Sequence, residues 1–334
     1  MTNDISPQPP VRWGILGTGA IAHRFMTGLR AVPEAEVVAV GSRSAATAEH
    51  FAQTWNIPRA HGTYAELAAD TGVDVVYVAT PHSVHREAGV LCLEAGRHVL
   101  CEKPLAVNTA EATAMIAAAQ RTDRFLMEAM WTRFAPATAA ARALVAEGAI
   151  GEIRMVQASI GGRMDYDPRS RLFAPELAGG ALLDVGVYPV AFASMVLGEF
   201  TSLTAQAHKA PTGVDTQVAM TVTGPGGTLG LLGCSIETPI PRRADIVGTR
   251  GSIALTDWFC PTALVLHRDG AQPERRDFPH RANGFEHEVE EVHRRLHAGQ
   301  RQSPLMSWEE SLRIAGTLDA VRERIGVAYP ADQR

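Results

Sequence analysis

The sequence predicts an α/β protein that begins with a Rossmann-type, doubly wound parallel sheet and continues into a second part built on a large sheet. In the first third of the chain, short apolar runs alternate with helical patterns, as expected for a parallel sheet with helices on both faces. A glycine-rich turn follows the first of these runs. Farther along, strand-like runs follow one another with few helices between them, which favours an antiparallel sheet. We therefore expect one domain over residues 1–130 and a second over residues 131–334.

The elements of the first domain follow from the spacing of its apolar residues. Apolar, β-branched runs predict strands at residues 11–16, 37–40, 73–79, 98–101 and 124–128. A helical period predicts helices at residues 20–31, 45–55, 83–95 and 110–119. Parallel strands joined in this way are connected by right-handed crossovers.

The second domain is predicted to be rich in strands. Strand-like runs occupy residues 152–161, 203–207, 217–223, 228–236, 244–249 and 263–267, and helical patterns occupy residues 285–296 and 308–325. An antiparallel sheet usually has one face that needs covering. We expect helices on one face and a partner subunit on the other.

The composition is that of an ordinary globular protein. The 334 residues are 46% apolar and 20% charged and carry a formal net charge of −5, so the basic excess of a nucleic-acid binder is missing. No two cysteines form a C-x-x-C pair, which disfavours a zinc knuckle or a redox dithiol. We expect four reduced thiols, as in a cytosolic protein: Cys92, Cys101, Cys234 and Cys260.

The N-terminus and the hydropathy give no sign of membrane targeting. Residues 1–10 lack the basic flank and apolar core of a signal peptide, which indicates a disordered leader. No uncharged apolar run approaches the roughly 18–20 residues of a membrane span. These observations predict a cytoplasmic protein with no membrane partner.

A G-x-G-x-x-A motif joins the first predicted strand to the first predicted helix. Its residues are Gly17, Thr18, Gly19, Ala20, Ile21 and Ala22. In such a motif Gly17 permits the tight turn, Gly19 lets a pyrophosphate approach the backbone, and Ala22 lets the helix pack on the strand. The helix N-terminus then offers free amides and a positive dipole end. The motif predicts a dinucleotide site.

The end of the second strand predicts which dinucleotide is preferred. NAD sites place an acid there, but here Ser42 and Arg43 follow the strand. A guanidinium pairs with a 2′-phosphate, so we favour NADP. The alternative is that Arg43 is solvated and NAD is also accepted.

Two further strand ends point to the reacting centre. In an open α/β sheet, ligands bind outside the carboxyl ends of the strands. Thr80, Pro81, His82 and His85 follow one strand, and Glu102 and Lys103 follow the next. We predict that these residues contact the cofactor and that Lys103, extended by the following proline, holds a substrate oxygen. His82 is equally consistent with a satisfied loop histidine.

The segment 179–189 carries an acid and a phenol in apolar surroundings. If it is helical, Asp184 and Tyr188 share one face. This pattern predicts an inward-facing site. The alternative is an interface helix in which the two side chains satisfy each other.

These motifs together resemble the glucose–fructose oxidoreductase/inositol dehydrogenase (Gfo/Idh/MocA) family. The resemblance rests on GTGAIA, ATPHSVH, CEKPLAVN, MEAMWTRFAP and GGALLDVGVYPV, and it covers nearly the whole chain. Many family members carry His where this chain has Tyr188. That difference and MEAMWTRF favour the branch with dimeric dihydrodiol dehydrogenases and NADP-dependent xylose and glucose dehydrogenases.

The resemblance implies roles for several residues. It implies an NAD(P)-binding N-terminal domain and a C-terminal α/β domain whose large, mostly antiparallel open sheet forms a homodimer or homotetramer. It implies catalytic roles for Lys103, Asp184 and Tyr188. It also implies a substrate pocket near Trp131 and Arg133, with Trp258 and Phe259 at an aromatic site; Arg163 comes from the polar segment 162–175, which either grips substrate or forms a solvated lid.

The predicted chemistry is hydride transfer between NADP(H) and a hydroxyl-bearing carbon of an aldose, polyol or trans-dihydrodiol. We expect Tyr188 to move the hydroxyl proton, with Lys103 lowering its pKa and Asp184 orienting Lys103 or the substrate. One alternative is a keto- or anhydro-sugar reductase that uses the same site; another is a non-catalytic NADP-binding sensor. No metal is expected, because His287 and His293 do not form an H-E-x-x-H motif and are interpreted as surface or interface residues.

Overall fold

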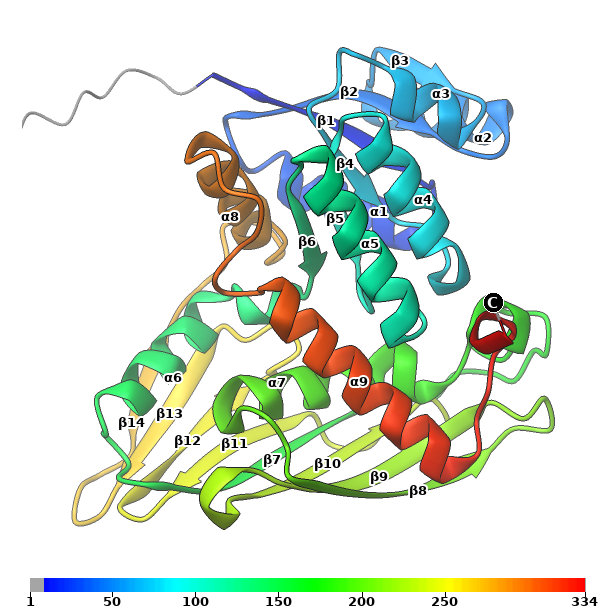
Figure 1. The fold of residues 1–334 in the computed structure, drawn as a ribbon. Helices are drawn as coiled ribbons and strands as arrows, with labels where there is room; N and C mark the ends of the chain where they lie inside the picture. Colours follow the sequence, from blue (N-terminus) through cyan, green and yellow to red (C-terminus); the bar gives the residue numbers. More distant parts are fainter. Residues whose placement is uncertain (1–8, 334) are drawn as a thin grey trace, which may run out of the picture.

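The computed structural model describes residues 9–333. It contains two sheets with helices packed between them (Figure 1). The predicted leader, residues 1–10, lies outside the described residues apart from Pro9 and Pro10. The first sheet is fully parallel, with strand order β3-β2-β1-β4-β5-β6. Its strands are β1 (Val11–Leu16), β2 (Ala35–Gly41), β3 (Arg59–His61), β4 (Val75–Val78), β5 (His98–Glu102) and β6 (Leu126–Ala129). The predicted Rossmann-type sheet is confirmed.

Helices cover both faces of the parallel sheet. They are α1 (Ala20–Leu29), α2 (Ala45–Trp55), α3 (Tyr64–Ala69), α4 (His85–Glu94) and α5 (Thr109–Thr122). Phe25 of α1 stacks on Tyr77 of β4 on one face. Leu67 of α3 and Met115 of α5 belong to the apolar cluster on the other. Burial on both faces explains why these strands read as continuous apolar runs.

The second sheet is mostly antiparallel, in the order β14-β13-β12-β11-β7-β10-β9-β8, with one parallel pair between β7 and β10. Its strands are β7 (Ile153–Gly161), β8 (Ser202–Lys209), β9 (Asp215–Thr223), β10 (Leu229–Ser235), β11 (Arg243–Gly248), β12 (Gly251–Thr256), β13 (Ala263–Arg268) and β14 (Glu274–Asp277). Helices α6 (Pro136–Ala146), α7 (Val187–Leu197) and α9 (Trp308–Ile325) cover one face, and no helix within residues 9–333 covers the other (Figure 1).

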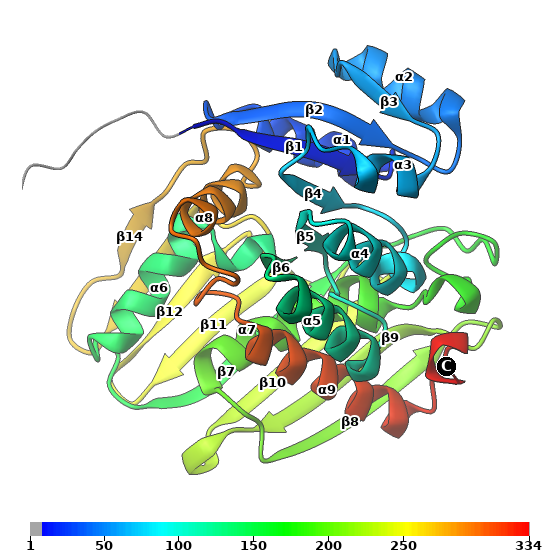
Figure 2. The same ribbon diagram turned by 45° about the horizontal axis from the view of Figure 1, so that its top comes forward.

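The C-terminal segment returns to the first sheet. Helix α8 (Glu286–His297) packs beside α1, and Figure 2 shows it next to β1 and β6. His293 of α8 is 5% exposed and accepts a hydrogen bond from Trp13 Nε1 at 2.9 Å. The surface placement expected for His293 is therefore wrong: the residue packs between α8 and β1 within the chain.

Short helical turns join the larger elements. They are η1 (His82–Val84), η2 (Trp131–Arg133), η3 (Pro175–Leu177), η4 (Leu182–Gly186), η5 (Pro225–Gly227) and η6 (Pro330–Gln333). The segment Pro175–Leu197 is long and apolar enough to cross a membrane by length and composition alone, and its most apolar stretch of 18 residues has a mean hydropathy of 1.7. It contains Asp184, and 83% of its most apolar stretch is buried inside the protein, which is the environment of a core helix.

Several elements were not predicted. The strand β14 (Glu274–Asp277) has the sequence ERRD, and charged residues are typical of a strand at the edge of a sheet rather than in its middle. β12 begins with Gly251 and Ser252, which are poor strand formers. α3 and β3 are short, so their apolar period has little length in which to appear.

Candidate active site

The turn after β1 is shaped for a ligand that approaches its backbone. Gly17 has a φ of +107°, and a Cβ there would lie 2.6 Å from the carbonyl oxygen of Ala79. Gly19 has ordinary dihedral angles and no protein atom within 4 Å of an added Cβ. The protein alone therefore does not require a glycine at residue 19, whereas a pyrophosphate lying against the backbone would.

The N-terminus of α1 can bind phosphate. Among the described residues no side chain caps this helix, and its first turn contains no acid. Its free N–H groups and positive dipole end face the open side of Gly19. Thr18 and Ile21 are partly exposed, and Ala20 is exposed, while Ala22 is fully buried against the sheet. These residues fit the diphosphate of a dinucleotide.

The end of β2 presents Arg43 to solvent. Arg43 is exposed. Its positive charge partly offsets the rise in the pKa of Tyr64 that burial causes. Ser42 is partly buried and its hydroxyl lies 2.7 Å from the Thr47 hydroxyl. A guanidinium in this position is available to an anionic group on the adenosine ribose.

The turn after β4 is buried and points toward the second sheet. The Thr80 hydroxyl is buried and has no hydrogen-bond partner within residues 9–333. His82 Nδ1 lies 3.3 Å from the carbonyl oxygen of Ala178. Burial, followed by the effects of His85 and Lys103, lowers the pKa of His82 to about 3, so this ring is neutral and donates that bond.

His85 bridges the backbone of the turn after β4 and the turn after β5. Its ring is completely buried, with Nδ1 2.8 Å from the carbonyl oxygen of Pro104 and Nε2 2.9 Å from that of Thr80. The structure therefore places His85 behind the turn that carries Lys103. Its predicted contact with the cofactor stays a prediction.

Lys103, which follows β5 of the first sheet, contacts Asp184, which lies in η4 beside the second sheet. Lys103 Nζ donates a 2.5 Å hydrogen bond to the backbone carbonyl of Asp184 and lies 3.7 Å from its Oδ1. Asp184 belongs to the π-helical turn η4, a rare conformation that is frequent at functional sites. Arg171 also donates to Asp184 Oδ1, at 2.7 Å. Asp184 thus holds one largely buried cation, Lys103, and one half-exposed cation, Arg171.

The two cations determine the charge of Asp184. Burial alone would raise its pKa, but Lys103 and then Arg171 lower it to about 2. The carboxylate is therefore ionised at neutral pH. Arg171 comes from the polar segment 162–175 and is half-exposed, so at least this part of the segment contributes to the site. Arg163 is exposed, and its predicted substrate role stays a prediction.

Tyr188 lies in an aromatic corner beside Lys103. Lys103 Nζ lies 4.9 Å from the centroid of its ring. The Tyr188 hydroxyl accepts a 3.2 Å hydrogen bond from Trp131 Nε1, and both rings meet Phe259 edge-on at 5.0 Å. Asp184 and Tyr188 have separate partners, so the alternative in which they satisfy each other does not apply.

The expected effect of Lys103 on Tyr188 is wrong for the ligand-free chain. Burial, and then the charge of Glu102, raise the pKa of Tyr188 well above 10, while the hydrogen bond from Trp131 lowers it only in part. Lys103 faces the ring rather than the hydroxyl oxygen. The phenol is consequently neutral and available as a proton donor.

Arg133 is placed differently from the prediction. Its guanidinium is 6% exposed and pairs with Glu310 at 2.6 Å, with the carbonyl oxygens of Ala191 and Leu305 as further acceptors. All these partners are protein groups of α7, α9 and the loop before α9. Arg133 therefore ties those elements together, and its assignment to substrate binding is not supported by its contacts.

Of the two aromatic residues expected together, only Phe259 reaches Tyr188. Trp258 is 1% exposed, donates to the carbonyl oxygen of Ser159 at 2.8 Å and packs on Phe192. The two residues lie in the turn that follows β12, where Trp258 packs toward the sheet and Phe259 faces the site.

A group of histidines and an acid at the start of α8 could ligate a metal by position. His280, Glu286 and His287 place their ligand atoms within 4.8 Å of one another. However, the Glu286 carboxylate already accepts hydrogen bonds from four consecutive backbone amides, those of residues 281–284. The acid clamps the loop that precedes α8.

Two residues near the site were not predicted from the sequence. Phe285 stacks on Trp131 with ring centroids 4.5 Å apart, and Glu288 affects the pKa of Tyr188. Phe285 immediately precedes α8 and Glu288 lies on it, far from the other motifs in sequence. Their spacing of three residues, with an acid on an otherwise apolar face, was the available signal.

Comparison with known proteins agrees with this geometry. Residues 11–130 match the model of an oxidoreductase family with an NAD-binding Rossmann fold, and residues 138–254 match a GFO/IDH/MocA C-terminal domain. The chain is 40% identical to the trans-1,2-dihydrobenzene-1,2-diol dehydrogenases of Mus musculus and Homo sapiens, over 97% of this chain and 99% of each relative.

Solved structures of similar proteins bind a nucleotide or a polyol. One is a 3-ketoreductase from Actinomadura kijaniata in complex with NADP and TDP-benzene, with a TM-score of 0.85, 28% identity, and coverage of 95% of this chain and 98% of that one. Another is an aldose–aldose oxidoreductase from Caulobacter crescentus complexed with glycerol, with a TM-score of 0.86, 25% identity, and coverage of 97% and 98%.

Proposed function

Because this chain belongs to the Gfo/Idh/MocA oxidoreductase family, we propose that it transfers a hydride between NADP(H) and a hydroxyl-bearing carbon of a trans-dihydrodiol or an aldose. The observation that carries the proposal is the meeting of Lys103 and Tyr188. Lys103 comes from the end of a strand of the parallel sheet, Tyr188 comes from a helix of the second sheet, and Nζ lies 4.9 Å from the phenol ring. A cation and a proton donor so placed suit a carbon–oxygen centre that is reduced or oxidised.

The N-terminal domain, residues 1–130, would bind the cofactor. The turn at Gly17 and Gly19 and the start of α1 would hold the diphosphate, and the orphan hydroxyl of Thr80 would gain a partner there. Arg43 and Ser42 would bind the 2′-phosphate, which favours NADP over NAD. The bound nicotinamide supplies the hydride chemistry.

The residues of the chain would move the proton and stabilise the charge. The Lys103 ammonium would donate to the substrate oxygen and offset its developing negative charge. Tyr188 would pass a proton to that oxygen in reduction and take it back in oxidation. Asp184 would fix Lys103 through its carbonyl, at 2.5 Å, and would present its carboxylate to a neighbouring hydroxyl of the substrate.

One observation favours reduction of a keto sugar as a second candidate. The phenol of Tyr188 is neutral in the ligand-free chain because burial raises its pKa, so it can donate a proton without prior ionisation. The similar 3-ketoreductase was solved in complex with NADP. A non-catalytic NADP sensor is the less favoured function, because Lys103 and Tyr188 are both present and in contact.

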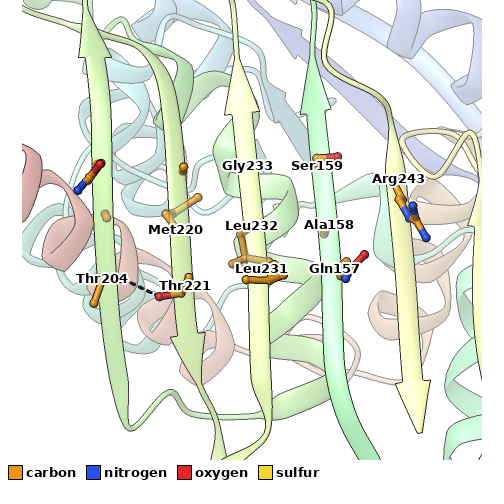
Figure 3. Close-up of a pocket in the computed structure, with 13 residues that line it drawn as sticks. Gln157, Ala158, Ser159, Thr204, Met220, Thr221, Leu231, Leu232, Gly233 and Arg243 are labelled. Carbon is orange, nitrogen blue, oxygen red and sulfur yellow. Dashed lines mark hydrogen bonds between the residues drawn. The ribbon is translucent and has the colours of Figure 1, made fainter.

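The second domain, residues 131–334, would bind substrate and form a homodimer through the bare face of its sheet. A hollow of about 580 Å³ lies on this face. Figure 3 shows Gln157, Thr221, Leu231 and Arg243 among the residues that line it. Leu229 and Leu231 of β10 are 46% and 44% exposed there. A second copy of the sheet would cover these leucines. The four free cysteines fit a reducing, cytoplasmic location.

The test is a substrate panel run with NADP, NAD and their reduced forms. Purified protein is mixed with trans-dihydrodiols, aldoses, polyols and keto sugars, and the nicotinamide absorbance is followed. We expect turnover of a trans-dihydrodiol or an aldose, faster with NADP than with NAD. Binding of NADPH without turnover of any compound in the panel would favour the sensor.

The proposed homodimer has a separate test. Leu231→Glu should shift the sedimentation of the protein to that of a monomer.

A further inference from the structure

Glu288 is a buried acid without a partner. Its side chain is 0% exposed, and neither Oε1 nor Oε2 has a hydrogen-bond partner within residues 9–333. Its neighbours on α8 differ: Glu286 accepts four backbone amides, and Glu291 binds Arg294, Arg295 and Ser303. A buried polar group left unpaired is destabilising and rare in native proteins. The isolation of Glu288 indicates that its partner comes from outside the chain.

The position of Glu288 on α8 places it at the reacting end of the site. Glu288 follows Phe285 by three residues, so the two side chains share a face of the helix. Phe285 stacks on Trp131 with a centroid distance of 4.5 Å. Trp131 in turn donates to the hydroxyl of Tyr188. This face of α8 therefore looks toward the catalytic phenol.

The same face also meets the strand ends of the parallel sheet. Phe285 contacts Phe25 edge-on at 5.9 Å, and Phe25 stacks on Tyr77 at 3.6 Å. The Tyr77 hydroxyl donates a short hydrogen bond to Glu102, which immediately precedes Lys103. Glu288 thus lies between the hydrogen-bonded pair Tyr77–Glu102 and the hydrogen-bonded pair Trp131–Tyr188.

We propose that Glu288 is a cofactor-binding residue whose neutral carboxylic acid forms two hydrogen bonds with the carboxamide of the bound nicotinamide. This inference rests on the proposed function. In the pairing, the acid O–H donates to the amide oxygen and the acid carbonyl accepts from the amide N–H. Both unpaired carboxyl oxygens of Glu288 then have a hydrogen-bond partner. A single substrate hydroxyl does not pair with both oxygens.

The surroundings favour the neutral acid that this pairing needs. Burial, and then the charge of Glu102, raise the pKa of Glu288 well above its ordinary value. The titratable groups that face it from the other elements are Glu102, Tyr77 and Tyr188. None of them is a cation that would ionise Glu288.

The test measures NADPH binding without substrate, by fluorescence titration, in Glu288→Gln and Glu288→Leu. Glutamine offers the carboxamide one donor and one acceptor, so its Kd should stay within about threefold of wild type. Leucine offers neither, so its Kd should rise about tenfold or more. Replacing an unpaired buried acid by leucine does not remove a protein hydrogen bond, so thermal melting should show that Glu288→Leu is folded. Glu291→Gln is the matched control, because this acid has protein partners, and its NADPH affinity should be unchanged.

A second probe separates the carboxamide from the rest of the cofactor. The 3-acetylpyridine analogue of NADPH replaces the amide nitrogen by a methyl group, so the affinity difference between wild type and Glu288→Leu should shrink with it. Equal NADPH affinity of wild type and Glu288→Leu would overturn the proposal. If, in addition, turnover were lost in Glu288→Gln, the result would favour proton transfer by Glu288 instead. Failure of the wild type to bind any nicotinamide nucleotide would overturn the proposed function as well.

Discussion

Tyr188→Phe tests the role of a single oxygen atom. Within residues 9–333 this hydroxyl has one hydrogen bond, from Trp131 Nε1 at 3.2 Å, while the ring contacts with Phe259 and Lys103 do not need it. Loss of the hydrogen bond should cost about 1 kcal/mol of stability. Loss of proton transfer should lower kcat by roughly 10²- to 10⁴-fold, which corresponds to about 3–5 kcal/mol in the barrier.

The assay combines turnover with cofactor binding. The kcat of Tyr188→Phe is measured by nicotinamide absorbance with the best substrate of the panel, and the Kd for NADPH by fluorescence. We expect a large fall in kcat with an unchanged Kd, because Tyr188 lies on the second domain, away from the phosphate-binding turn. Trp131→Phe is the matched control: it removes the same hydrogen bond from the other partner and keeps the phenol, so its kcat should fall less than about tenfold. A near-normal kcat in Tyr188→Phe would remove Tyr188 from the mechanism.

Three further predictions follow from single contacts. Arg43→Glu should lower the ratio of kcat/KM with NADP to that with NAD at least about tenfold, because a carboxylate repels the 2′-phosphate; an unchanged ratio would leave Arg43 without this role. Arg133→Met should cost about 1.5–3 kcal/mol of unfolding free energy, because Glu310 loses its buried partner but keeps the ion pair with Arg313; a raised KM with unaltered Tm would instead return Arg133 to substrate binding. Burial would raise the pKa of Asp184, but Lys103 and other cations lower it to about 2, below the ordinary 3.8. Its charge therefore stabilises the fold above the ordinary pKa, and this contribution is lost as the pH falls through about 2. In Asp184→Asn the free energy of unfolding should therefore depend less on pH than in wild type between pH 3.8 and about 2.

The sequence was informative where function depends on local backbone geometry. The turn at Gly17 and Gly19, the exposed Arg43 after β2 and the Lys103 turn after β5 each lie where the local pattern predicts. Such features are determined by a few consecutive residues, and a strand followed by a glycine turn and a helix has one common use. They could therefore be recognised before the fold was known.

The sequence was less informative where a side chain depends on distant partners. Arg133 lies in the same short segment as Trp131, yet one side chain turns to Glu310 and the other to Tyr188. His293 is polar and lies on a charged helix, but it is buried because Trp13 offers it an indole N–H. Tertiary contacts of this kind have no sequence period, so they appear only in the folded structure.

The electrostatics of Tyr188 illustrates the same limit. A lysine and a phenol predicted to be close suggest a lowered phenol pKa. The structure adds complete burial and the neighbouring acid Glu102, which act in the opposite direction, and it places the ammonium over the ring. The sign of the pKa shift depends on these distances and not on the identity of the residues.

The most direct test of the account is the exchange of deuterium between labelled NADPH and the reacting carbon of a substrate, measured for wild type and for Lys103→Met. The account predicts that wild type transfers the label to the carbon that bears the new hydroxyl group. It also predicts that Lys103→Met binds NADPH normally but transfers the label at least about a hundredfold more slowly, because the developing charge on the substrate oxygen loses its cation. Label transfer at the wild-type rate by Lys103→Met would contradict the account.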